Sequence, residues 1–213
     1  MTLDHLVVAA ASLDAGVQWC EATLGIAPGP GGKHALMGTH NRLFSIAGAA
    51  FPQAYFEIIA IDGDAAPPRR ARWFGLDELD LRAGPRLLHW VARCSALDAR
   101  LAALHAAGFD AGAAIAVARD TPRGRLAWRI GVRDDGRLLC GGALPTLIEW
   151  GAAHPSDAMP PSGMVLHSLT LRGVPAAAAQ ALGWPGVEFA ANAGPALSAT
   201  LDTPRGRVTL HSD

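Results

Sequence analysis

The chain has 213 residues, half of them hydrophobic and 17% charged, which excludes a disordered protein because disorder requires low hydrophobicity and high net charge. A formal net charge of −1 provides no basic field for phosphate backbones, so we expect no nucleic-acid partner. Three cysteines without a Cys-x-x-Cys spacing indicate reduced thiols. The start resembles no signal peptide and no apolar run reaches about 18 residues, which predicts a cytoplasmic protein without membrane contact.

The first predicted unit begins with a strand over residues 3–10, which is rich in β-branched side chains. Ser12 is a good helix N-cap, apolar residues then recur at helical spacing, and Gly25 can close the helix in the left-handed conformation. Strand-like segments at 42–47 and 54–61 follow. Together with the three strands that follow the helix in the second copy below, these segments predict a roughly βαβββ module over residues 1–63.

A linker at 64–85, with a short helix around residues 73–81, leads to a second copy of this pattern. Its strand covers 86–94, Ser95 is the expected helix cap, and further strands are expected at 113–118, 126–132 and 146–150. His5 and His89 are 84 positions apart, and the motif Leu-Asp-Ala at 13–15 and 97–99 has the same offset. A constant offset indicates duplication, so residues 86–153 form a second βαβββ module.

A third, shorter unit spans residues 164–213, where a strand is followed by an alanine-rich helix and two strands. The hexapeptide Asp-Thr-Pro-Arg-Gly-Arg occurs at 120–125 and again at 202–207, and its Pro/Gly pattern predicts a hairpin turn in both places. The expected fold class is α+β: paired βαβββ modules forming a cup-shaped mixed sheet, plus a truncated third βαββ unit.

Two histidines and two glutamates stand at matching places in the modules. His5 and His89 lie on the predicted first strands, and Glu57 and Glu149 lie among large apolar residues on the last strands. A charge buried in such surroundings costs several kcal/mol unless it is paired or bound to metal. A divalent cation held by two imidazoles and two carboxylates would remove this cost. The alternatives are structural histidines, and glutamates at an exposed edge or paired with Arg or Lys.

Several segments are similar to the vicinal oxygen chelate superfamily, the group of glyoxalases, bleomycin-resistance proteins and extradiol dioxygenases. They are the opening LDHLVVAAASLDAGVQWCEATLGI, the strand YFEIIA, and the later strands LLHWVA and TLIEW. Residues 31–34 (GGKH) and 38–43 (GTHNRL) resemble a signature of its glyoxalase-like branch. The resemblance covers about residues 3–152.

This resemblance implies a divalent metal, Zn, Ni, Mn or Fe, held by four ligands, which are His5, Glu57, His89 and Glu149. It also implies a lyase or isomerase that acts on a small vicinal-oxygen compound through an enediolate or oxyanion. Glu149, or else Glu57, is the expected catalytic base.

The same resemblance implies that His34, Thr39 and Asn41 contact the substrate. An extradiol dioxygenase and a metal-free small-molecule-binding module are the alternatives. Many members of the superfamily dimerise, so a homodimer is one expectation. The alternative expectation is that the third unit covers a sheet edge with which a partner would otherwise pair.

Overall fold

The computed structural model describes residues 1–183 and 187–212. Residues 184–186 and 213, which belong to the predicted third unit, lie outside the described residues. The α-helices are α1 Leu13–Leu24, α2 Leu97–Ala106 and α3 Ala176–Leu182, and short 3-10 helices are η1 Trp73–Glu78, η2 Cys140–Gly142 and η3 Pro155–Ala158. The strands are β1 Thr2–Ala9, β2 Lys33–His34, β3 Thr39–Ser45, β4 Tyr55–Ile61, β5 Arg86–Arg93, β6 Ala113–Thr121, β7 Gly124–Val132, β8 Thr146–Trp150, β9 Val165–Arg172, β10 Glu188–Ala190, β11 Leu197–Thr203 and β12 Gly206–His211.

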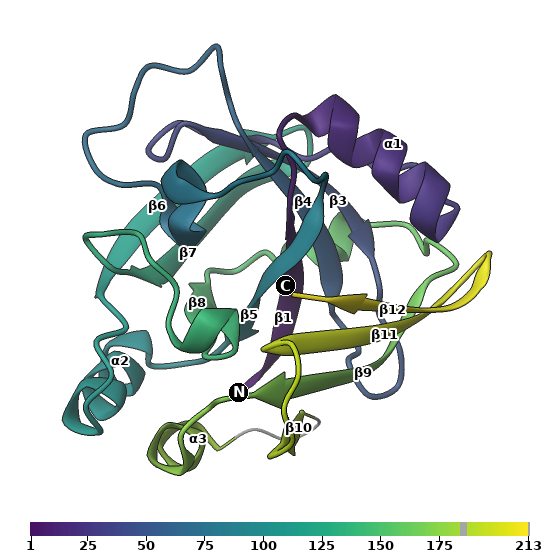
Figure 1. Ribbon diagram of the computed structural model, residues 1–213. Helices are drawn as coiled ribbons and strands as arrows, with labels where there is room; N and C mark the ends of the chain where they lie inside the picture. The colour runs from purple at the N-terminus through teal and green to yellow at the C-terminus, as the bar shows by residue number, and fades with distance from the viewer. Residues whose placement is uncertain (184–186, 213) are drawn as a thin grey trace.

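The first two units share one sheet, whose strand order is β2-β3-β4-β1-β5-β8-β7-β6. In each unit the last strand pairs parallel with the first, and the two units join through the antiparallel pair β1–β5. The sheet curls into a cup, with the β6–β7 hairpin and β3 toward its rims (Figure 1). The predicted pair of βαβββ units in a mixed, cup-shaped sheet is therefore confirmed.

Helix α1 begins at the N-cap that the sequence predicts, whereas α2 begins one residue later than predicted. Ser12 accepts a hydrogen bond from the backbone amide of Ala15 at 3.1 Å, and Gly25 closes α1 with a φ of 80°. The prediction that Ser95 caps α2 is wrong. The N-cap position belongs to Ala96, whose φ is 57°, and no side-chain cap bond forms within the helix. Instead, a carboxylate from strand β8 binds the Ala96 amide, as described below.

Two apolar cores lie on the two faces of the large sheet. The outer core packs α1, α2 and the third unit against residues such as Leu6, Phe56 and Trp90. The inner core lines the cup and includes Val7, Trp128 and residues of η1. Because side chains alternate along a strand, one register decides which residues enter each core.

The third unit has one more strand than predicted and forms its own sheet, in the order β10-β9-β11-β12. The missed strand is β10, whose three residues pair parallel with β9. It escaped prediction because three residues give no usable alternation. The unit lies across β1 and β5 between α1 and α2, on the outer face of the cup (Figure 1).

Both copies of the hexapeptide form the predicted hairpin turns, β6–β7 and β11–β12. In each, a threonine hydroxyl donates to the glycine carbonyl three residues on, from Thr121 at 2.6 Å and from Thr203 at 2.8 Å. The sequence thus fixes the turn, but the two turns have different surroundings. Arg205 donates to the Glu21 carbonyl near the end of α1, whereas its counterpart Arg123 lines a groove.

The linker carries the predicted short helix in a distorted form. Phe74 and Gly75 have φ values of 62° and 68°, which are left-handed and break the helical turn. This conformation is strained for phenylalanine, and it directs Trp73 and Phe74 into the inner core. Among the residues that the structure describes, no helix is long and apolar enough to cross a membrane.

Candidate active site

Three central strands bring polar side chains onto the inner face of the cup. In the parallel pair β1–β4, Val7 stands opposite Glu57, and in the antiparallel pair β1–β5 it stands opposite His89. His5, two residues before Val7, shares that face because alternate residues point the same way. The structure thus places three of the four predicted ligands, His5, Glu57 and His89, on one face, all of them buried.

Asp4 joins this face although it directly precedes His5. The β1–β5 register shifts between Leu3 and His5, so Asp4 occupies an irregular position of the kind found at a bulge. Its carboxylate accepts hydrogen bonds from His5 Nδ1 at 2.7 Å, Trp150 Nε1 at 3.0 Å and His154 Nε2 at 2.9 Å. Burial alone would raise the pKa of Asp4, but the hydrogen bonds and charges of His154 and His5 overcome this effect and hold the pKa well below its usual range. Asp4 is therefore an anion.

His5 lies between two carboxylates. Its Nδ1 donates to Asp4, and its Nε2 lies 3.5 Å from Glu57 Oε2. Burial opposes the positive charge, but both carboxylates favour it and together raise the pKa of His5 to about 9. The ring also stacks on Tyr55, with centroids 4.6 Å apart, which favours a cation over an aromatic face. His5 is an imidazolium at neutral pH.

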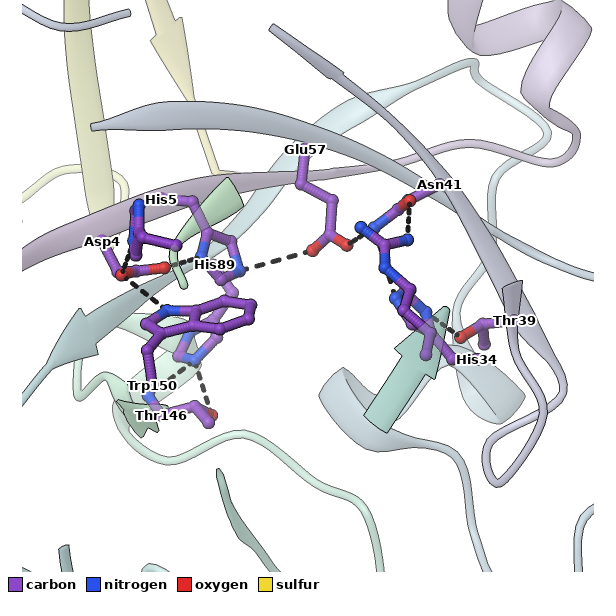
Figure 2. Close-up of polar contacts among 11 residues, drawn as sticks. Asp4, His5, His34, Thr39, Asn41, Glu57, His89, Thr146 and Trp150 are labelled. Carbon is purple, nitrogen blue, oxygen red and sulfur yellow. Dashed lines mark hydrogen bonds and ion pairs between the residues drawn. The ribbon is translucent and has the colours of Figure 1, made fainter. Parts of the chain in front are cut away.

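A hydrogen-bonded chain runs from Glu57 to Thr39 (Figure 2). Asn41 Nδ2 donates to Glu57 Oε1 at 2.6 Å and lies 3.3 Å from His34 Nε2, while His34 Nδ1 is 3.0 Å from Thr39 Oγ1. The amide can donate both its protons, so Nε2 of His34 accepts and Nδ1 donates to the threonine. The three predicted substrate contacts therefore form one unit with Glu57.

Burial and neighbouring polar groups set the charges of the residues in this series of hydrogen bonds. Burial lowers the pKa of His34 to about 4, so its ring is neutral. Burial alone would raise the pKa of Glu57, but the hydrogen bond and charge of His5, with smaller contributions from His34 and Asn41, lower it. An ionised glutamate thus stands beside a protonated histidine in a mostly apolar cup.

Arg119 reaches this cluster from the opposite rim of the sheet. It lies on the edge strand β6, and its Nη1 is 3.4 Å from Asn41 Oδ1 on β3. Gly32 makes room for it, because a Cβ at that position would lie 2.0 Å from Nη1. Gly32 also donates its backbone amide to the same Asn41 oxygen at 2.8 Å. The arginine therefore joins the two ends of the curled sheet.

His89 faces the cup, but both of its ring nitrogens bond to backbone groups of the second unit. Its Nδ1 donates to the Gly142 carbonyl at 2.8 Å, and its Nε2 accepts from the Thr146 backbone amide at 2.9 Å. Burial lowers the pKa of His89 to about 3, so the ring is neutral. Both nitrogens are used within the second unit, which is the structural role that the sequence left open as an alternative.

Glu149 lies on the other face of the sheet. Its neighbours Ile148 and Trp150 point into the cup, so alternation turns Glu149 outward. There Oε1 accepts from the Ala96 amide at the start of α2 at 2.6 Å, and Oε2 lies 3.5 Å from Arg129 Nη1. The structure does not bring Glu149 together with the other predicted ligands. Its surroundings are those of a helix cap and ion-pair partner, the alternative stated for the glutamates.

The donor set fits only in part the divalent metal that the resemblance implies. His5 and Glu57 fit part of such a centre, and Asp4 binds the second nitrogen of His5 as carboxylates do for metal-binding histidines. His89 and Glu149 do not fit. Within residues 1–183 and 187–212, no group of three or more His, Cys, Asp or Glu side chains could hold a metal ion. The same geometry does not fit the two-histidine, one-carboxylate iron site of a dioxygenase.

A small cavity and a larger groove adjoin the cluster. The cavity is about 30 Å³, enough for roughly one or two water molecules, and His5, Glu57 and aromatic rings such as Trp73 and Trp150 line it. The groove is about 580 Å³, which is within the usual range for small-molecule sites. Leu43, Arg119 and Pro155 line both spaces, so these residues separate the cavity from the groove.

Sequence reasoning missed Asp4, His154 and Arg119. Asp4 carried a usable signal, because an acidic residue directly before a candidate histidine can orient its ring. His154 lies in the connector 150 positions from its partner Asp4, and Arg119 is 78 positions from Asn41. No local pattern announces either contact.

Comparisons with known proteins agree with this architecture. A family model described as a glyoxalase-like domain matches residues 3–185. No curated protein matches the chain. The structure is similar to that of a hypothetical protein from Staphylococcus aureus, with a TM-score of 0.59 and 11% identity over 99% of this chain and 85% of that one. That likeness spans all three units and concerns the fold alone.

Two further solved structures are more distant. Methylmalonyl-CoA epimerase from Mycobacterium tuberculosis has a TM-score of 0.43 and 22% identity, covering 74% of this chain and 91% of that chain. A Streptomyces coelicolor methylmalonyl-CoA epimerase in complex with 2-nitronate-propionyl-CoA has a TM-score of 0.45 and 17% identity, over 72% and 97%.

Proposed function

The chain belongs to the glyoxalase-like domain family, and we propose that it moves a proton on a small compound with adjacent oxygens, as an isomerase or lyase does. The observation that carries this proposal is the buried pair of His5 and Glu57, whose facing atoms are 3.5 Å apart beside the inner cavity. Glu57 is the base, and His5 is its charged partner.

The pair has the two functions that enolisation requires. An ionised carboxylate can take a proton from the carbon next to a carbonyl group. The negative charge then develops on the carbonyl oxygen, where a fixed imidazolium can donate a hydrogen bond to it. His5 is charged and Glu57 is ionised at neutral pH, so each begins in the form that its role needs. Both residues line the same cavity.

The neighbouring residues position this pair. Asp4 holds the His5 ring through Nδ1, which leaves Nε2 directed toward Glu57 and the cavity. Asn41, supported by His34 and Thr39, holds one oxygen of Glu57 and leaves the second toward His5. The ring of Tyr55 and the indoles of Trp73 and Trp150 exclude water, which strengthens the electrostatic effect of His5 on a developing oxyanion.

Hydrogen–deuterium exchange tests this proposal without knowledge of the final product. The protein is incubated in D₂O with 2-oxoaldehydes, 2-hydroxyketones and 2-oxo acids, and loss of the proton next to the carbonyl is followed by NMR. At least one compound should exchange faster than in buffer. The variant Glu57→Gln should lose about 10²–10⁴-fold of that rate, the usual contribution of a general base.

Two results would contradict the proposal. One is a panel in which no compound exchanges above the buffer rate. The other is a folded Glu57→Gln protein that exchanges as fast as the wild type. His5→Gln provides a second test, since removing the imidazolium should slow exchange while leaving Glu57 in place.

A binding module without catalysis is a second candidate, favoured by the aromatic lining of the cup and by the adjoining groove of about 580 Å³. Trp73, Trp128 and Trp150 would report such binding through quenching of their fluorescence. A compound that quenches tightly and shows no exchange would favour this candidate over the enzyme.

A further inference from the structure

Arg119 has hydrogen-bonding capacity that the described residues do not use. A guanidinium carries five N–H donors, and the contact with Asn41 Oδ1 at 3.4 Å engages one nitrogen. Its Nε is buried and has no hydrogen-bond partner among residues 1–183 and 187–212. Within the described part of the chain, no carboxylate lies within ion-pair distance of Arg119, although most other arginines of the β6–β7 region and the loop that follows have such a partner.

Arg119 is positioned beside the residues that hold the proposed base. Burial disfavours its charge, and the nearest compensation is the charge of Glu57, which acts from beyond ion-pair distance. Arg119 and Glu57 bind opposite ends of the same Asn41 side-chain amide, at Oδ1 and Nδ2 respectively. A single amide group, that of Asn41, therefore stands between the guanidinium that would bind an anion and the proposed base.

We propose that Arg119 anchors a carboxylate of the substrate, so that the substrate is a small carboxylic acid with an oxygen on the neighbouring carbon, such as a 2-oxo or 2-hydroxy acid. This inference rests on the proposed function, because it names the substrate class for the same site. Arginine suits the role since its planar fork can hold a carboxylate through two parallel hydrogen bonds.

The groove supports an anionic ligand that enters past Arg119. Of the described charged residues that line it, three are arginines, Arg119, Arg123 and Arg125, and one is an aspartate, Asp157. The net positive lining would attract an acid, and the apolar side chains of Ile26, Phe44 and Met159 leave room for substituents of varied size. The carboxylate would bind where the groove meets the cavity.

A matched pair of probes tests the anchor directly. Pyruvate carries the carboxylate, and pyruvamide has nearly the same shape without the charge. Calorimetry should show that wild-type protein binds pyruvate at least tenfold more tightly than pyruvamide. Arg119→Met should weaken pyruvate binding by about 10- to 100-fold. Arg119→Lys keeps the charge but loses the planar fork, so its affinity for pyruvate should lie between those of the wild type and Arg119→Met. Arg42→Met, at an exposed position on β3, is the control and should bind as the wild type does.

The exchange assay separates failure of this inference from failure of the proposed function. If pyruvate binds through Arg119 but its methyl protons do not exchange, the anchor holds and the proton-transfer function is contradicted for this class. If pyruvamide binds or exchanges as well as pyruvate, or if folded Arg119→Met and Arg119→Lys both bind pyruvate normally, the anchor is wrong. The proposed function then stands if any compound of the panel still exchanges through Glu57. Melting temperatures establish that each variant is folded.

Discussion

The two halves of the cup derive from the same βαβββ pattern and have become chemically different. The half formed by the first unit carries a connected series of hydrogen bonds and an ion pair, which runs from Asp4 through His5, Glu57 and Asn41 to His34. In the second half, the equivalent histidine is bound within its own unit and the equivalent glutamate lies outside, so mostly apolar and aromatic side chains face the cavity. The comparison teaches that the first half supplies the His5–Glu57 pair, whereas the second supplies the apolar wall that strengthens it and one charged side chain, Arg119.

The largest expected effect separates the two glutamates. Glu57→Gln should reduce the proposed exchange activity by about 10²–10⁴-fold. Glu149→Gln should leave the rate per folded molecule unchanged and cost about 1 kcal/mol of stability through the weakened cap on α2. NMR exchange rates and urea unfolding measure the two. Equal loss of activity in both variants would show that Glu149 takes part in the reaction.

Asp4→Asn should have the next largest effect, now on stability. Removing one charge from a buried ion pair costs about 3–5 kcal/mol, because His5 then loses a partner that stabilises its charge. The pKa of His5 is raised, so its contribution is fully present below the unfolded value of about 6.5 and is lost as pH rises through about 9. We expect the wild type to lose unfolding free energy across that interval and the variant to lose less. Parallel pH profiles for the two proteins would contradict this assignment.

His89→Leu tests the structural role given to the second histidine. The substitution leaves the Gly142 carbonyl and the Thr146 amide without their partner, at about 1–3 kcal/mol for each. The lowered pKa means that the unfolded chain binds a proton first, so His89 makes the wild type less stable as pH falls below about 6.5 toward 3. The variant should therefore be less stable at neutral pH and show a shallower decline in acid. A loss of exchange activity in the folded variant would instead place His89 in the catalytic machinery.

The smallest expected effect is that of divalent metals. Since the structure brings together two of the four ligands that the resemblance implies, Zn, Ni, Mn or Fe should leave the melting temperature unchanged, and EDTA should do the same. Calorimetric scans of purified protein measure this. A metal-dependent increase that His5→Ala abolishes would show that His5 and Glu57 acquire further ligands on binding.

By itself, the sequence determined the two repeated βαβββ units, the capping of α1, both hairpin turns and the inner face for His5 and His89. These features depend on local pattern: side-chain alternation, helical spacing and turn residues act over a few positions. It also indicated His34, Thr39 and Asn41 through resemblance, and the structure joins them to Glu57.

The tertiary structure decided which of these residues meet. A glutamate between two large apolar neighbours looks the same on either face, so the strand register had to place Glu57 inside the cup and Glu149 outside it. Only the curl of the sheet brings Arg119 to Asn41, and only the return of the connector after β8 brings His154 to Asp4. Such contacts join residues far apart in the chain, where no local periodicity can specify a partner.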